Sequence, residues 1–293
     1  MALKDGTVVP KGFEFEHVSV EPIIAAFRRM VRNAGFDISE MAISTYLCAR
    51  DWGKQFTAIP VFPVRAWQHG GVAFNAKSGI ETPKDLNGKR VGVRAYTVTS
   101  GLWARGILQE EYGVDLDSIT WVVNDEEHVA EYQLPANVEV AAGKDLAKML
   151  ADGEIDAAIG AGRSESPDVK PLIPNAQQAA FDYYQKKGVF PINHTVVIQN
   201  RHLQEHPELA AQVFDAFKQA KEPYLRRLAD GTASVEEQNG VKDRQIVGKD
   251  PVPYGVEANR AALEAVIRFN LDQKIIRQAP RVEDIFAPGT VEP

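Results

Sequence analysis

Two histidines stand at positions where an imidazole could move protons. His194 begins an apolar, β-branched run, His194–Gln199, and His69 follows Arg65 by four residues, just before a Gly-Gly turn. Imidazole titrates closest to neutral pH among the side chains, so it often serves as a general acid or base. The competing interpretations are structural: a hydrogen-bonded histidine starting a strand for His194, and a surface histidine for His69.

Three arginines follow segments that resemble strands or glycine turns. They are Arg65, Arg94 and Arg163, the last of which comes after Gly160-Ala-Gly162. A guanidinium offers paired N–H donors that match a carboxylate. In open α/β sheets, side chains at strand ends line the ligand cleft. The three arginines are therefore candidate clamps for an acidic ligand, and solvated salt bridges are the alternative.

A run of hydroxyl side chains precedes a predicted amphipathic helix. The run is Tyr96-Thr-Val-Thr-Ser-Gly101, and a shorter Ser-Thr pair follows the strand-like segment Asp37–Ile43. Free N–H groups and hydroxyls gather at a helix start, where an anion is favoured, although helix capping alone would explain the same residues. The candidate contacts to a carboxylate are Tyr96, Thr97, Thr99, Ser100, Ser44 and Thr45.

Two tryptophans, Trp67 and Trp103, could stack on an aromatic ligand. A buried tryptophan is more often part of a core, so packing is the alternative for both.

Composition limits the class of protein. The chain has 293 residues, a net charge of -7 and a single cysteine, Cys48. The charge disfavours nucleic acid and anionic membrane surfaces, which points to a small-molecule partner. One cysteine excludes an internal disulfide framework and suits the cytoplasm, and no apolar run approaches the ~20 residues of a membrane helix. We find no phosphate loop and no metal-binding motif, so we expect neither a cofactor nor a metal.

The elements that must position these side chains alternate between strands and helices, which is typical of α/β layering. Predicted helices follow Pro22, span about Pro207 to Gly231 and end the chain at about Val256 to Leu271, whereas 167–180 and 231–253 look irregular. The predicted strands are Thr57–Phe62, Gly71–Asn75, Arg90–Ala95, Ile119–Val123, Asp156–Ala161 and His194–Gln199.

Several motifs together resemble the 4,5-dihydroxyphthalate decarboxylase branch of the periplasmic-binding-protein type II superfamily. The most specific are Phe36-Asp-Ile-Ser-Glu-Met41, Ala58-Ile-Pro-Val-Phe-Pro63, Leu102-Trp-Ala-Arg-Gly-Ile-Leu108 and Gly188-Val-Phe-Pro-Ile-Asn-His194. The resemblance implies two lobes with a ligand cleft between them, one formed by 1–75 and 196–293 and the other by 76–195. Members of this branch carry a Tyr-Asp-Arg-Thr-like strand ahead of the point where this sequence starts, which leaves open whether the start is native.

The resemblance implies non-oxidative, cofactor-independent removal of CO2 from a hydroxylated aromatic dicarboxylate. His194 would then protonate the ring carbon, and His69 would act as base for the phenol or as a relay. Arg65, Arg94, Arg163 and the hydroxyl run would hold the substrate, and the resemblance adds Tyr254. A solute-binding protein for an organic acid, or an enzyme that makes a cofactor precursor, are the alternatives, and a homo-oligomer stays open.

Overall fold

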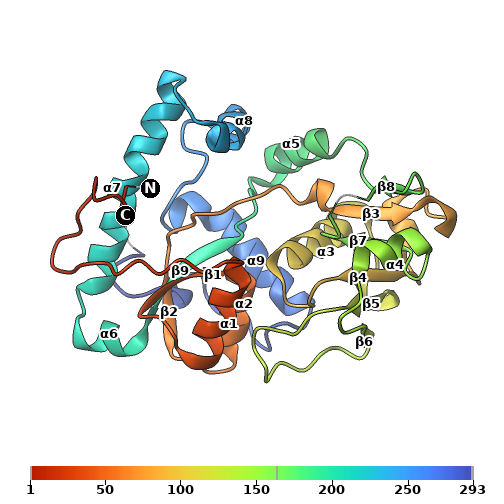
Figure 1. Cartoon of the computed structure of the whole chain (residues 1–293), viewed down its shortest axis with the longest axis horizontal. Helices are drawn as coiled ribbons and strands as arrows, with labels where there is room; N and C mark the ends of the chain where they lie inside the picture. The colour runs from red at the N-terminus through yellow and green to blue at the C-terminus, as the bar shows by residue number, and fades with distance from the viewer. Residues whose placement is uncertain (1, 163, 292–293) are drawn as a thin grey trace.

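A computed structural model describes residues 2–162 and 164–291, and it confirms the predicted mixed α/β fold (Figure 1). Two separate sheets lie side by side, one of three strands and one of six. Each sheet has helices packed against it, so the chain forms two lobes, which we call the first lobe (small sheet) and the second lobe (large sheet).

The small sheet is antiparallel and has the order β1-β9-β2. Its register sets Ala42 of β1 opposite His194 of β9. The chain reaches β9 only after completing the second lobe, so this strand ties late sequence to early sequence. Its strands are β1 Ile38–Ala42, β2 Phe56–Ile59 and β9 His194–Gln199.

The large sheet has the order β6-β5-β4-β7-β3-β8, and β3 alone runs against its neighbours. The parallel strands β4 and β7 are largely buried, as expected for strands covered by helices. A Cβ on Gly92 in β4 would lie 2.7 Å from the terminal methyl of Ile155, so a larger residue there would force that side chain to shift. The strands are β3 Val72–Asn75, β4 Arg90–Val93, β5 Thr120–Val123, β6 Val138–Val140, β7 Ala157–Ile159 and β8 Val169–Pro171.

The helices fill the spaces beside and between the sheets. Helices α1 and α2 pack on β1, while α9 packs on both α2 and α3 and so joins the lobes. Gly106 in α3 permits this close approach, because a Cβ there would lie 2.3 Å from the Phe269 ring. The helices are α1 Ile23–Asn33, α2 Ile43–Asp51, α3 Thr99–Tyr112, α4 Leu146–Asp152, α5 Ala176–Lys187, α6 Asn200–Glu205, α7 Leu209–Asp230, α8 Gln238–Val247 and α9 Arg260–Asp272.

The prediction that 231–253 is irregular is wrong. Within 231–253 the chain forms α8, and the sequence signal for its start is a Ser-x-x-Glu pattern. Ser234 and Glu237 make both hydrogen bonds of a capping box at the short 3-10 turn that leads into α8. Within 167–180 the structure places β8 and the beginning of α5, and an irregular connection joins them.

Two chain segments cross between the lobes and pair with each other (Figure 1). Arg65 and Ile192 form an antiparallel bridge, and the Asn193 N–H donates to the Val64 carbonyl over 2.9 Å. The Trp103 indole N–H donates to the Ile192 carbonyl over 2.8 Å. We call these paired segments the hinge.

We propose the predicted division of the chain between the two lobes, with one boundary moved. Strand β3 falls inside the predicted first-lobe segment 1–75 but pairs with β7 and β8 of the large sheet. We therefore propose that the first crossing lies before Val72 rather than at 75/76.

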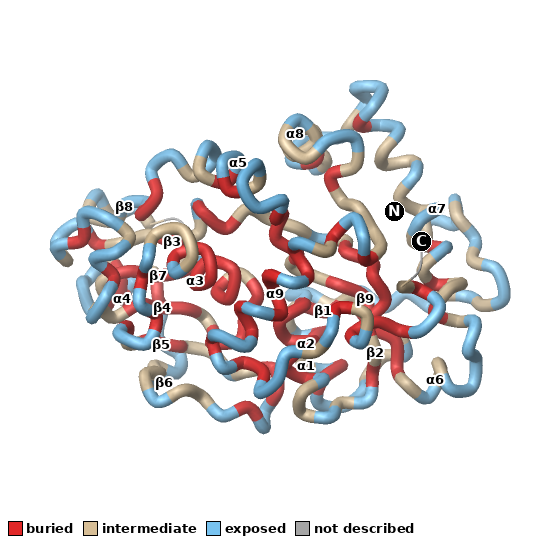
Figure 2. The backbone as a smooth tube through the Cα atoms, turned by 180° about the vertical axis from the view of Figure 1, so that it is seen from behind, coloured by how far each residue is buried: buried red, intermediate tan, exposed pale blue. Residues whose placement is uncertain are grey.

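Buried residues of β1, β9, α9 and α3 lie next to one another, so the core is continuous at the junction of the lobes (Figure 2). In the part of the chain that the structure describes, no helix is both long and apolar enough to span a bilayer.

Candidate active site

His194 forms a close pair with a carboxylate that the sequence analysis did not identify. Its Nδ1 lies 2.5 Å from Oε1 of Glu40. Side chains alternate faces along a strand, so Glu40, two residues before Ala42, shares a face with His194 across the ladder. A carboxylate only accepts, so His194 donates from Nδ1 and its Nε2 is left for another partner.

The His194 ring is held on a second side by Phe27 of α1. The ring centroids are 5.1 Å apart and the planes are nearly perpendicular. The histidine side chain keeps 17% of its surface exposed, so it is packed but still reachable. Two contacts from different elements therefore fix the imidazole, which is the arrangement a proton donor needs.

Arg65 carries a positive charge that meets only neutral oxygens. Its guanidinium donates to the carbonyls of Phe190 and Pro253 and to the Asn259 side chain. Burial lowers the pKa of Arg65 to about 10, so it stays charged at neutral pH. An arginine whose hydrogen-bond partners are all neutral favours an anion nearby.

Arg65 lines a pocket of about 280 Å³ at the hinge. Phe190 forms one wall and is itself stacked on Trp67, with centroids 4.1 Å apart. Asp250 and Tyr184 also line this space, which we call the hinge pocket. Its volume lies just below the usual range of ligand pockets, about 300 to 1,000 Å³, so it suits only a small ligand.

Tyr254 connects the hinge pocket with the histidine pair electrostatically. Burial raises the pKa of the Tyr254 phenol, the charges of Asp250 and Glu40 raise it further, and Arg65 lowers it. Lys221 lies 4.1 Å above its ring. Charges of both the hinge pocket and the histidine pair therefore affect the pKa of this phenol.

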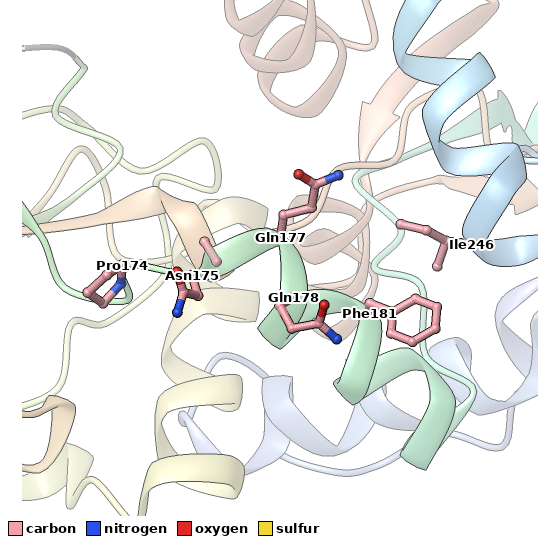
Figure 3. A pocket seen from close by; sticks show the side chains of 7 residues that line it. Pro174, Asn175, Gln177, Gln178, Phe181 and Ile246 are labelled. Carbon is pink, nitrogen blue, oxygen red and sulfur yellow. The ribbon is translucent and has the colours of Figure 1, made fainter.

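A second pocket, of about 460 Å³, lies between α5 and α8 (Figure 3). Phe181 of α5 and Ile246 of α8 face each other across it. Its lining has no charged side chain, so it offers no proton donor and no ionic clamp for an acidic substrate. We therefore centre the candidate site on the hinge pocket.

The hydroxyl run at the start of α3 binds a carboxylate, but this carboxylate is the side chain of Glu127 and not a ligand. The Glu127 carboxylate accepts from the backbone N–H groups of Tyr96 and Thr97 and from the Thr97 hydroxyl, at 2.5 to 3.1 Å. Ser100, one residue inside the helix, is half-buried. The predicted anion site is therefore already satisfied by Glu127 in this structure.

The predicted contacts from α2 face the same loop region and are buried. The Thr99 hydroxyl accepts from the Ser44 N–H over 3.2 Å, and the Ser44 hydroxyl donates to Asn270. The Thr45 hydroxyl lies 3.0 Å from Nδ1 of His128, whose Nε2 is buried without a partner. Burial first, then Arg94 and Arg28, lower the pKa of His128 to about 3, so this imidazole is neutral.

Arg94 closes an ion-pair bridge between the lobes. It lies 2.9 Å from the Asp125 carboxylate, and Arg28 of α1 lies 2.7 Å from the same oxygen. Arg94 therefore forms a salt bridge, which the sequence analysis gave as the alternative to a contact with an acidic ligand. Its side chain still keeps 35% of its surface exposed.

The hydrogen bonds and ring contacts of the described chain do not join the remaining predicted residues to His194 or Glu40. His69 is buried in the second lobe, where its ring packs on Tyr183 and burial lowers its pKa. Trp103 is fully buried, so its indole serves the hinge rather than offering a stacking face. Arg163 lies outside the described residues.

Sequence reasoning missed five residues that the structure brings into contact with the predicted ones or into the pocket: Glu40, Asp125, Glu127, His128 and Asp250. The period of two along β1 could have placed Glu40 on one face with the strand end. The acidic run Asn124–Glu127 follows β5 just as Arg94 follows β4, and the carboxyl ends of parallel neighbours share an edge. No sequence pattern pointed to Asp250.

Within residues 2–162 and 164–291, no cluster of three or more His, Cys, Asp or Glu side chains is arranged to hold a metal ion.

Solved structures with similar folds define the class of protein. The chain resembles a mutant of the enzyme DszB in complex with biphenyl-2-sulfinic acid, with a TM-score of 0.58, 17% identity and coverage of 99% of this chain and 92% of that one. It also resembles the periplasmic aliphatic sulphonate binding protein SsuA from Escherichia coli, with a TM-score of 0.54, 12% identity and coverage of 96% and 84%. These likenesses establish a two-lobed periplasmic-binding-protein fold.

Sequence relatives narrow the class to a family. A family model described as "NMT1/THI5 like" matches residues 54–144. The 4,5-dihydroxyphthalate decarboxylase of Comamonas testosteroni is 32% identical over 91% of this chain and 86% of its own length. That of Pseudomonas putida is 37% identical over 54% of this chain and 67% of its length. The chain belongs to the 4,5-dihydroxyphthalate decarboxylase family, whose named members are carboxy-lyases.

Proposed function

We propose that this protein removes CO2 non-oxidatively from a hydroxylated aromatic dicarboxylate of the 4,5-dihydroxyphthalate type, giving a protocatechuate-type product. The observation that carries the proposal is the match to the Comamonas testosteroni enzyme along 91% of the chain. Two features of the structure suit the chemistry: Arg65 lines the hinge pocket and has only neutral hydrogen-bond partners, and the small sheet holds a reachable histidine, His194, with its carboxylate partner.

The reaction exchanges CO2 for a proton at one ring carbon. In our proposal, His194 is doubly protonated: its Nδ1–H donates to Glu40, and its Nε2–H delivers the proton to the carbon that bears the carboxylate, while a ring hydroxyl donates electron density to the ring. The carbon–carboxylate bond then breaks, its electron pair restores aromaticity, and CO2 leaves. Glu40 keeps the imidazole oriented throughout, because its hydrogen bond to Nδ1 leaves Nε2 directed elsewhere.

Arg65 is the proposed clamp for the carboxylate that remains on the ring. Its charge and its position in the hinge pocket support this role. We keep Arg94, Tyr96, Thr97, Thr99, Ser100, Ser44, Thr45 and Tyr254 as proposed substrate contacts; those at the start of α3 would require Glu127 to give way.

His69 stays the proposed base or relay for the phenol. Its lowered pKa favours neutral imidazole, which is the form that accepts a proton. As part of the same proposal, we assign the protein to the cytoplasm, because its named relatives are enzymes rather than transport components.

One alternative has an observation in its favour. The fold is shared with the sulphonate-binding protein SsuA, so binding an organic acid without turnover would use the same architecture. A fold does not distinguish the two functions, whereas turnover does.

The test is incubation of the purified protein with 4,5-dihydroxyphthalate, with CO2 and protocatechuate followed by mass spectrometry. We expect both products in equal amounts. Thermal stabilisation by the same acid with no product would favour the binding-protein alternative. The absence of both product and stabilisation would contradict the enzyme and the binding-protein functions alike.

A further inference from the structure

The hinge pocket contains a cation and an anion that do not pair with each other. Arg65 and Asp250 both line it, and the charge of Asp250 raises the pKa of Arg65 against the larger effect of burial. Among the ion pairs of the described chain, none joins them within 4.0 Å, and Arg65 instead donates to three neutral oxygens. Opposite charges that face one space without closing leave room for a ligand between them.

Asp250 is held in place and still has free capacity to accept hydrogen bonds. Its Oδ2 lies 2.6 Å from Nζ of Lys221, and its Oδ1 accepts from the Val252 N–H at 2.9 Å. A carboxylate offers about four lone-pair sites, so about two stay unused. Lys221 is nearly buried, whereas the Asp250 side chain keeps 33% of its surface exposed.

Such a pocket suits a ligand with an acceptor at one end and a donor at the other. A carboxylate is the natural partner of Arg65, and a hydroxyl is the natural donor to Asp250. A ring that lacks hydroxyls would leave Asp250 without a donor from the ligand while covering it. Asp250 would keep Lys221 and the Val252 N–H, but covering its unused acceptor sites without a new donor has a cost, which is how a polar site rejects an analogue without the donor.

We propose that Asp250 is a specificity residue that recognises the ring hydroxyls of the substrate, while Arg65 recognises a carboxylate. This inference rests on the proposed function. It makes the preferred ligand a hydroxylated aromatic acid and not an unsubstituted phthalate, and it assigns Lys221 the task of positioning Asp250.

The experiment measures binding by calorimetry, with 4,5-dihydroxyphthalate and phthalate as the two probes, in proteins that all carry His194→Ala so that turnover does not consume the first probe. We expect the protein with Asp250 intact to bind the dihydroxylated probe at least ~10-fold more tightly, since a site built to pair a hydroxyl rejects the analogue without one. Asp250→Asn should remove most of that preference by weakening the dihydroxylated probe alone. Asp250→Asn keeps the side-chain shape and an oxygen for the Val252 N–H, so folding is checked by its unfolding midpoint.

The matched control is Asp243→Asn, because Asp243 accepts one hydrogen bond, from Trp67, and does not line the hinge pocket. Lys221→Met should weaken both probes, since it leaves Asp250 as an uncompensated negative charge. A preference that survives Asp250→Asn, an equal loss for both probes, or no preference while Asp250 is intact would overturn the inference. Failure of the proposed function is separate, because it appears as binding without CO2 release in the protein that keeps His194.

Discussion

His194 and Glu40 are diagonal neighbours on adjacent antiparallel strands, and their facing atoms, Nδ1 and Oε1, lie 2.5 Å apart. The two residues are 154 positions apart in the sequence, and the chain builds the whole second lobe between them. Opening or closing of the lobes therefore need not disturb this pair, because both partners belong to the small sheet.

Replacing His194 with Ala removes the proposed proton donor. We expect turnover of 4,5-dihydroxyphthalate to fall by at least ~100-fold, with substrate affinity nearly unchanged, because general acid catalysis contributes about 10² to 10⁴ in rate. Release of CO2 and calorimetric binding measure the two effects separately. His202→Ala is the control, since His202 also contacts a carboxylate, Asp37, at 2.7 Å. Unchanged turnover in His194→Ala would remove this residue from the mechanism.

Glu40→Gln keeps the shape of the partner but removes its charge. A charge-assisted hydrogen bond is about twice as strong as a neutral one, so the imidazole should be oriented less firmly. We expect kcat to drop roughly 10-fold with KM nearly constant. Asp37→Asn is the matched control at the surface pair. A rise in KM with kcat unchanged would mean that Glu40 acts in binding instead.

Arg65→Lys keeps a positive charge but loses the planar set of donors. We expect the substrate dissociation constant to rise roughly 10-fold and the free energy of unfolding to fall by about 1 to 3 kcal/mol, because acceptors such as the Phe190 carbonyl lose their donor. Calorimetry and urea unfolding report these effects. Arg90→Lys is the control, since its pair with Glu139 is exposed and should change stability by less than about 1 kcal/mol. Equal affinity in both variants would contradict the clamp.

His128 should make stability depend on pH. Its pKa falls from 6.5 to about 3 on folding, so between these values the unfolded chain binds a proton that the folded chain does not. Titration of His128 therefore costs no stability above about pH 6.5. As the pH falls from 6.5 toward 3, it lowers the free energy of unfolding by at most about 1.4 kcal/mol per pH unit. Urea unfolding from pH 7.5 to 4.5 measures this slope.

The variant His128→Asn should flatten that pH dependence, because Asn can still contact Thr45 but does not titrate in this range. His206→Asn, at an exposed position, should leave the slope as it is. A wild-type slope that matches the His128→Asn slope would show that another group controls acid unfolding.

The sequence by itself determined the α/β class, the positions of most strands and the family. These features are local: a β-branched run bounded by turn residues, or a proline before an apolar helix, favours one structure whatever surrounds it. Even α8, which we predicted as irregular, carried its local start signal in Ser234 and Glu237. His194, Arg65 and Tyr254 were named as site candidates from residue type, position and resemblance, and their roles stay predictions.

Tertiary structure decided which of these side chains meet. The strand register placed Glu40 beside His194, since a one-residue slip of β1 would turn Glu40 to the other face. Folding also brought Glu127 to the start of α3, where the sequence predicted an external anion, and set Asp250 in the pocket with Arg65. A residue's type limits what it can bind. Its actual partner is fixed by strand register and by packing between segments that are far apart in the chain, and a local sequence pattern does not specify which distant segments will meet.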